Sequence, residues 1–321
     1  DNDKSIAVFE QSDYIGGRVR TVYDKYKGKK FSYDAGAARF NDNHQSLIGV
    51  IKRCGLYKNI IKIPSFWDFR PSDDYKKKAE KIPYDNVEDL LNDLLKHYNK
   101  PGFKNYLKNK TFYEACLDLY GPKVAEFLKN SYSYYSEIKV FNGNNAIKTL
   151  SNDLGESNQF YILGGGLSTV IHKTAEDFMN SCRSKTTNKK CDRNRFICTR
   201  CAVKSWKYNK DTKKFIVNVF NLETDEYFKV TTTNLVIAVD GKAIRRWRNS
   251  LAELNSEVPN IISHVTAEPL MRTFAIYDSK WFKKENIGKF VTDATIKYFI
   301  PVNQDIGLVM VSYTDGEYVR R

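Results

Sequence analysis

The chain has 321 residues, of which 41% are hydrophobic, 14% aromatic and 28% charged. This composition is typical of a globular protein long enough for two domains, and it excludes disordered, collagen-like and coiled-coil chains. The longest apolar runs, such as 235–239, fall far short of the ~20 residues that a membrane helix needs. The first residues do not resemble the apolar core of a secretory signal. We therefore predict neither a membrane span nor an export signal in these residues.

The charge is positive and unevenly distributed. The 52 lysines and arginines outnumber the 38 acids, which gives a formal net charge of +14. Much of this excess lies between residues 183 and 214, where twelve basic residues accompany two acids. Such a segment is either a solvated loop and hairpin or an electrostatic site for nucleic acid or another polyanion. The sequence leaves both interpretations open.

The cysteines are too few and too scattered for a disulfide scaffold in a chain of this length. Four of the six cluster, and their thiolates could in principle hold zinc: Cys182, Cys191, Cys198 and Cys201. However, no glycine turn separates the last two, whereas zinc knuckles wrap the backbone around the metal. The alternatives are a disulfide between Cys182 and Cys191, or free thiols. We predict no metal site.

Two short segments near the start of the chain are suited to form one ligand site. Ser5–Glu10 is an apolar run that ends in an acid, which predicts a buried strand followed by a turn with the paired glycines Gly16 and Gly17. An acid at the end of a parallel strand is placed to accept hydrogen bonds from a ribose diol. The glycines would let backbone amides approach a pyrophosphate, and Arg18 could neutralise part of its charge. The second segment, 31–40, is rich in small residues.

The remaining elements form helical and strand patterns in blocks. Helices are predicted over 44–55, over several segments between 84 and 147, and over 167–179 after three consecutive glycines. Strands are predicted over 195–203, 213–220, 227–232 and 235–240, with a hairpin turn at 221–226. A second sheet is predicted from strands at 271–277, 296–300 and 306–313. The four histidines lie far apart, and none has metal-ligand spacing.

Taken together, Val8–Gln11, Gly16–Val19 and Tyr33–Phe40 resemble the flavin-containing amine oxidase family, which includes monoamine, polyamine and L-amino-acid oxidases. Later segments are similar to parts of the same family, so the resemblance spans nearly the whole chain. It implies an α/β protein with an FAD/NAD(P)-binding Rossmann-like flavin domain, incomplete here, and a second α+β substrate domain. The flavin domain would comprise 1–40 and 159–262, and the substrate domain, with its helical lobe, 41–158 and 263–321.

The resemblance also implies an FAD cofactor and the residues that bind it. The ribose would be held by Glu10, the pyrophosphate region by Gly16, Gly17 and Arg18, the isoalloxazine by Ala37 and Arg39, and the adenine by the backbone of Val203. The flavin would oxidise a C–N bond of a small-molecule amine or amino acid to an imine and release hydrogen peroxide.

Two departures from the family pattern affect this interpretation. The family's first strand with its Gly-x-Gly-x-x-Gly turn does not occur in these residues, and neither does its closing flavin segment. The position of the family's catalytic lysine falls on Arg272 or, in the other alignment, on Met271. Arginine keeps the charge but stays protonated, so it cannot accept a proton. We therefore expect that these residues are either part of a longer chain, or a degenerate, catalytically inactive homologue. Such a homologue would act structurally or bind nucleic acid through 183–214.

Overall fold

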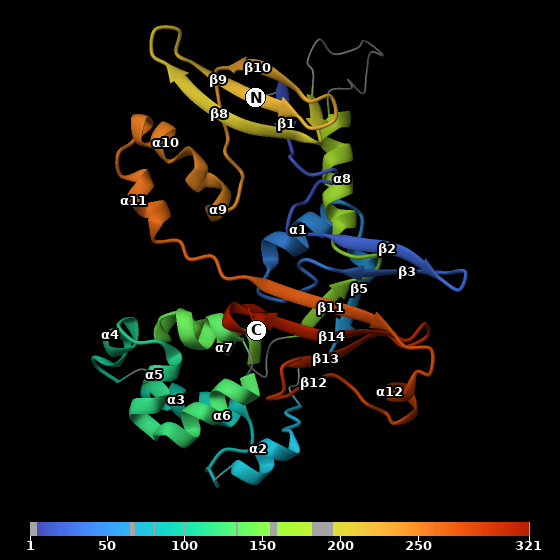
Figure 1. Cartoon of the computed structure of the whole chain (residues 1–321), viewed down its shortest axis with the longest axis vertical. Coiled ribbons are helices and arrows are strands. Elements are labelled where there is room, and N and C mark those ends of the chain that lie inside the picture. Colours follow the sequence, from blue (N-terminus) through green and yellow to red (C-terminus); the bar gives the residue numbers. More distant parts are fainter. Residues whose placement is uncertain are drawn as a thin grey trace.

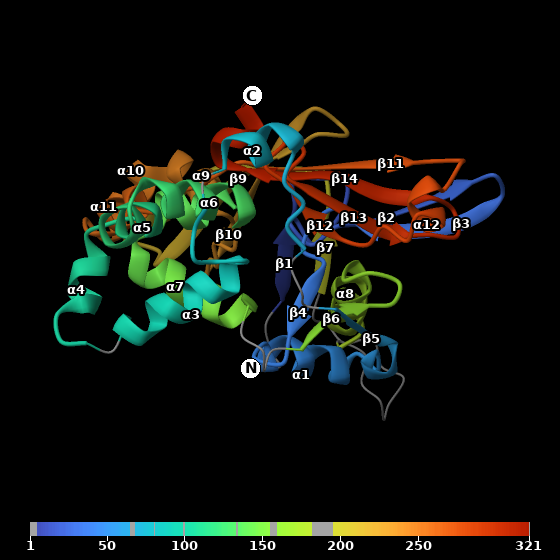
Figure 2. The same cartoon turned by 90° about the horizontal axis from the view of Figure 1, so that it is seen from below.

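The computed structural model describes residues 5–64, 68–79, 81–98, 100–132, 134–154, 159–181 and 195–320. Figure 1 shows three parts along the longest axis: an antiparallel meander with short helices at the top, a mixed middle part, and a sheet with a helical lobe at the bottom. In Figure 2 the helical lobe and the lower sheet lie on opposite sides of the molecule. No helix among the described residues is long and apolar enough to cross a membrane.

The first strand, β1 (Ile6–Phe9), pairs in parallel with β7 (Arg195–Cys198). This confirms the strand predicted before Glu10, but the prediction that it is buried was wrong. Its side chains Ile6 and Val8 are 39% and 41% exposed. The reason is that β1 has a strand neighbour on one edge only within the part of the chain that the structure describes.

The antiparallel meander consists of β8 (Cys201–Asn209), β9 (Lys214–Asn221) and β10 (Glu226–Thr232). Its hairpin turn forms as predicted, because the side-chain oxygen of Asn221 accepts hydrogen bonds from the backbone N–H groups of Glu223 and Thr224. One face of the sheet is buried against β1 and against the helix α10 (Arg248–Leu254). The core there contains Phe9, Trp206, Val217, Val219 and Leu251.

The strand predicted over 235–240 does not form. Residues 234–240 belong to no strand, and the side chain of Val236 is 86% exposed. An apolar, β-branched run becomes a strand only where a neighbour completes its hydrogen bonds, and no described segment pairs with it. The run leads instead into α9 (Gly241–Ile244), α10 and α11 (Val258–Ser263).

The middle part joins a hairpin, a small sheet and two helices. The hairpin is β2 (Thr21–Tyr26) with β3 (Lys29–Asp34), and the sheet has the order β4 (Arg39–Asn41), β6 (Phe160–Leu163), β5 (Ile60–Ile63). Both predicted helices are confirmed as α1 (Gln45–Arg53) and α8 (Ser168–Asn180). They pack together through a core of Phe40, Ile51, Leu163, Leu167 and Val170.

The predicted second sheet is also confirmed. Its order is β11 (Leu270–Ile276), β14 (Leu308–Asp315), β13 (Tyr298–Asn303), β12 (Phe290–Val291), and the short helix α12 (Trp281–Lys284) follows β11. The strand predicted over 296–300 begins two residues later. The cause is a turn closed by the hydrogen bond from Thr292 N–H to the carbonyl of Lys297.

The helical lobe contains the predicted helices in order: α3 (Val87–Tyr98), α4 (Phe103–Lys108), α5 (Phe112–Tyr120), α6 (Pro122–Tyr132) and α7 (Gly143–Leu154), with a π-helical turn at Ser136–Val140. A further short helix, α2 (Asp73–Lys78), lies beside the lobe (Figure 1). Asn86 caps α3, since its side-chain oxygen accepts the N–H of Asp89 at 2.9 Å.

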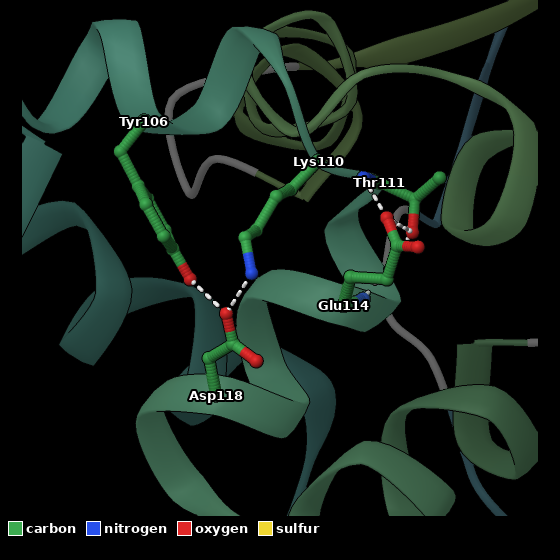
Figure 3. Close-up of polar contacts among 5 residues, drawn as sticks. All are labelled: Tyr106, Lys110, Thr111, Glu114 and Asp118. Carbon is green, nitrogen blue, oxygen red and sulfur yellow. Dashed lines mark hydrogen bonds and ion pairs between the residues drawn. The ribbon is translucent and has the colours of Figure 1, made fainter.

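The start of α5 shows why this lobe is well defined by local sequence. Thr111 and Glu114 form a reciprocal capping box, each side chain accepting a backbone N–H of the other residue (Figure 3). One turn later, Asp118 accepts hydrogen bonds from Tyr106 and Lys110 and so connects α5 to the end of α4. Burial and the bond to Asp118 raise the pKa of Tyr106 to about 12.

The structure describes four of the six cysteines. Cys182 and Cys191 lie outside the described residues, so the zinc and disulfide alternatives stay untested. The other four cysteines are free thiols: Cys54, Cys116, Cys198 and Cys201. Within the described ranges, no group of three or more histidines, cysteines or acids could hold a metal ion.

Candidate functional site

Glu10 directly follows β1 and is half-buried. Its backbone bridges the two neighbouring segments, because its N–H donates to the carbonyl of Cys198 and its carbonyl accepts the N–H of Cys201, both at 2.8 Å. One carboxylate oxygen accepts the N–H of Ser12 at 2.7 Å. No cation of the described chain forms an ion pair with this carboxylate, so its second oxygen is available to accept a ligand hydroxyl.

The turn after Glu10 is built on its two glycines. Both have positive φ, +108° at Gly16 and +55° at Gly17. A Cβ on Gly16 would lie 2.7 Å from the carbonyl oxygen of Val19, closer than real Cβ contacts, whereas a Cβ on Gly17 would meet nothing within 4 Å. The first glycine is therefore needed for the turn itself, and the second leaves open space beside the backbone.

Arg18 is exposed, and its backbone and side chain face different partners. Its carbonyl accepts the N–H of Ala37 at 2.9 Å, which places the glycine turn directly against the second predicted segment. Its guanidinium charge interacts with the carboxylate of Asp240, the residue that caps α9. The pKa of Asp240 is lowered mainly by the backbone N–H groups of Ala243 and Lys242, with a contribution from the charge of Arg18.

Ala37 and Arg39 line a cavity of about 510 Å³ between the turn, the start of α1 and the start of α8. Its wall also includes His44, Leu167 and Ile171. The guanidinium of Arg39 lies 4.9 Å from the centre of the Phe160 ring. This volume lies within the range of about 300–1,000 Å³ that is usual for ligand sites. Sequence analysis assigned no role to His44, because its isolated position in the chain offered no signal.

Arg272 connects β11 to the second segment. Its Nη1 donates to the carbonyl oxygens of Gly36 and of Asp34, the latter at 3.3 Å, and its guanidinium lies 4.6 Å from the centre of the Tyr313 ring. Its Nε is buried without a partner in the described structure. The alternative residue Met271 points outward and is 42% exposed. The geometry therefore brings Arg272, and not Met271, next to Ala37.

Asp34 is a site residue that the sequence did not indicate. Its carboxylate accepts hydrogen bonds from the hydroxyl of Thr21 at 2.6 Å and from the N–H of Leu167 at 3.1 Å. Burial raises its pKa, while these two hydrogen bonds and the charge of Arg272 act in the opposite direction. Ser168 extends the network, since its hydroxyl accepts the N–H of Thr21 at 2.8 Å. A half-buried acid is thus held among β2, β3, α8 and β11.

Val203 lies at the other end of the site, in β8. It is half-buried and shares a hydrophobic cluster with Phe9 of β1. The predicted residues therefore follow one another along a strip: Val203 and Glu10, then Gly16, Gly17 and Arg18, then Ala37, Arg39 and Arg272. In Figure 1 the strip follows α8 from the upper strands β1 and β8 to the level of β3 and β11.

The strip has features that suit an elongated dinucleotide such as FAD. A half-buried carboxylate with an available oxygen lies at one end, and a cavity lies at the other. Between them, Gly17 faces open space. At the cavity end, Arg272 is bonded to Gly36, the residue before the lining residue Ala37. The residues present fit the cofactor.

Comparisons with known proteins agree with this assignment. The family model of flavin-containing amine oxidoreductases matches residues 1–320. Among solved structures, the fold is similar to that of a protein from Exiguobacterium sp. 255-15 assigned as a protoporphyrinogen oxidase, with a TM-score of 0.58. The two chains are 13% identical, and the match covers 98% of this chain and 72% of that one. No curated protein matches the sequence.

The fold is therefore the FAD-binding α/β fold of flavin-dependent oxidoreductases. Since the family model covers nearly every residue, the chain belongs to the flavin-containing amine oxidoreductase family. The likeness to the solved structure concerns the fold alone. The division into 1–40 with 159–262 and 41–158 with 263–321, and the roles of the individual site residues, stay predictions.

Proposed function

We propose that the protein binds FAD along this strip and oxidises the C–N bond of an amine or amino acid. The observation that carries the proposal is the continuity of the strip. Backbone hydrogen bonds join Glu10 to Cys198 and Cys201, and Arg18 to Ala37, and the side chain of Arg272 joins Gly36. Residues from four distant parts of the sequence thus form one binding surface.

Different parts of the strip bind different parts of FAD. The available oxygen of Glu10 accepts hydrogen bonds from ribose hydroxyls, which are charge-assisted and stronger than bonds between neutral groups. Arg18 balances phosphate charge, and the open side of Gly17 admits the phosphate close to the backbone. Ala37 and Arg39 form the wall of the cavity at the ring end.

Bound flavin would supply the redox chemistry, in which a hydride from the substrate's C–H bond and the proton lost from its nitrogen are both transferred to dioxygen, which leaves an imine and yields hydrogen peroxide. Arg272 does not take the substrate's proton, because a guanidinium stays protonated. Its fixed position beside Gly36 instead provides a permanent positive charge at the cavity end of the strip. The proton lost from the amine must therefore go to another group or to solvent.

The test combines flavin content with peroxide release. The purified protein should show flavin absorbance and produce peroxide from at least one member of a panel of amines and amino acids. Glu10→Ala should weaken flavin affinity about tenfold to a hundredfold, the loss expected for a hydrogen bond to a charged group. Glu285→Ala, which removes an exposed acid at the end of α12, is the matched control. A folded protein that takes up no flavin, or a Glu10→Ala variant with unchanged affinity, would contradict the proposal.

A further inference from the structure

The meander β8–β10 has a second face that nothing in the described structure covers. Alternation along the strands places Trp206, Val217 and Val219 on the buried face. The residues between them point to the opposite face, which we call the outer face. It carries Ser205, Lys207, Lys214, Ile216, Asn218, Phe220, Tyr227, Lys229 and Thr231, and the bulge residue Lys204 lies over it.

The outer face is strongly basic. All four lysines of the three strands, Lys204, Lys207, Lys214 and Lys229, are exposed on it. The only acid in these strands is Glu226, the first residue of β10, and alternation places it away from the outer face. Neutral polar groups lie between the lysines, with Asn218 donating to the hydroxyl of Ser205 at 2.8 Å.

Two aromatic rings lie on the same face. Phe220 and Tyr227 are cross-strand partners with ring centres 4.7 Å apart, and Tyr227 is 69% exposed. The ammonium of Lys204 lies 5.0 Å from the centre of the Phe220 ring. The ring of Tyr227, packed on Phe220 and otherwise exposed, is therefore available to a stacking partner.

We infer that this outer face binds single-stranded nucleic acid. Exposed aromatic rings on an open antiparallel sheet stack on unpaired bases, and flanking lysines neutralise the backbone phosphates. Bases in a duplex are already stacked on each other, so a flat sheet face selects single strands. The inference uses only strand residues and does not depend on the flavin site, so each can fail without the other.

The experiment measures binding of a fluorescent oligothymidylate of about 20 nucleotides, longer than the ~4–16 nucleotides of a typical single-stranded site. Binding should weaken with salt, with a slope of log affinity against log salt of about −2 to −3 for three to four phosphate contacts. Lys207→Gln and Lys229→Gln should each reduce the slope by about 0.7. The matched control is Lys58→Gln, an exposed lysine far from the meander.

The aromatic contribution is tested separately. Tyr227→Ala should lose about fivefold to a hundredfold in affinity with an unchanged salt slope, the range of base stacking on a ring. Tyr227→Phe should restore binding, and Tyr57→Ala, which removes another exposed tyrosine, should have no effect. Circular dichroism of each variant establishes that the meander is folded.

Three outcomes would overturn the inference. The first is no binding at about 100 μM protein and low salt, the weak end of non-specific affinity. The second is duplex DNA or heparin binding as tightly as the single strand, with no effect of Tyr227→Ala, which would indicate a general polyanion surface. The third is full binding by both lysine variants, which would place the contact elsewhere.

Discussion

Arg272 is expected to stabilise the junction between β11 and the segment after β3, independently of any role in catalysis. Its Nη1 donates to two backbone carbonyls, and its guanidinium lies over the Tyr313 ring at 4.6 Å. A hydrogen bond from a charged donor contributes about 1.5–3 kcal/mol, and the ring contact about 0.5–1 kcal/mol. Because the bond to Asp34 is long, at 3.3 Å, we count one strong bond, one weak bond and the ring. Arg272→Met should therefore cost about 3 kcal/mol of unfolding free energy.

The assay is urea unfolding followed by circular dichroism, with Arg246→Met as the matched control, since Arg246 is exposed on the short turn before α10. Arg272→Lys should recover part of the loss, because lysine keeps the charge but lacks the planar guanidinium that stacks on the Tyr313 ring. The loss of Arg272 should also raise the pKa of Asp34 further, since the charge of Arg272 opposes the effect of burial. Equal midpoints for Arg272→Met and Arg246→Met would refute this account of the junction.

Three further predictions concern the helical lobe, Asp34 and the turn. Thr111→Ala should cost about 1 kcal/mol by removing the capping box of α5 (Figure 3), whereas Thr149→Ala, which loses only a bond back to Asn145 within α7, should cost less; a double-mutant cycle with Glu114→Ala that shows no coupling would contradict this. Burial raises the pKa of Asp34, so its folded form binds a proton that the unfolded chain releases, and stability should fall as pH rises from about 3.9 through the raised value. Asp34→Asn should flatten that part of the pH profile of unfolding, and a profile that keeps its slope would exclude Asp34 as the cause. Gly17→Ala should cost about 1–2 kcal/mol for its left-handed backbone, and Gly16→Ala clearly more because of its contact with Val19; equal costs would show that the turn relaxes.

The helical lobe could be predicted from sequence because its signals are local. Leu90, Leu91 and Leu94 repeat at helical spacing and are all buried, and capping residues stand at the starts of α3 and α5. The hairpin of β9 and β10 could be predicted for the same reason, since its strands alternate and a turn joins them. Neither required knowledge of distant residues. The strand predicted over 195–203 was wrong in extent, because a break at 199–200, with positive φ at Arg200, divides it into β7 and β8.

The wrong strand prediction at 235–240 and the site contacts that the sequence did not indicate have a different cause, because both depend on distant residues. Residues 6–9 and 235–239 are similar apolar runs, yet only the first finds a strand partner, β7, almost two hundred residues away in the sequence. The bond from Arg272 to Gly36 spans 236 residues. Asp34 has no distinctive neighbours in sequence, because its environment is made by Leu167 and Arg272. Pairings of this kind depend on the whole fold and not on any local pattern.

The way the strip is assembled explains how the fold can be shared at 13% identity. Its main connections are backbone hydrogen bonds, from Glu10 to Cys198 and from Ala37 to Arg18, and these do not depend on which side chains are present. Side chains are excluded only where two backbones approach closely. A Cβ on Gly36 would lie 2.1 Å from the carbonyl oxygen of Arg18, and one on Gly16 would lie 2.7 Å from that of Val19. These glycines belong to the segments by which the sequence resembles its family, because there the backbone geometry itself fixes the residue type.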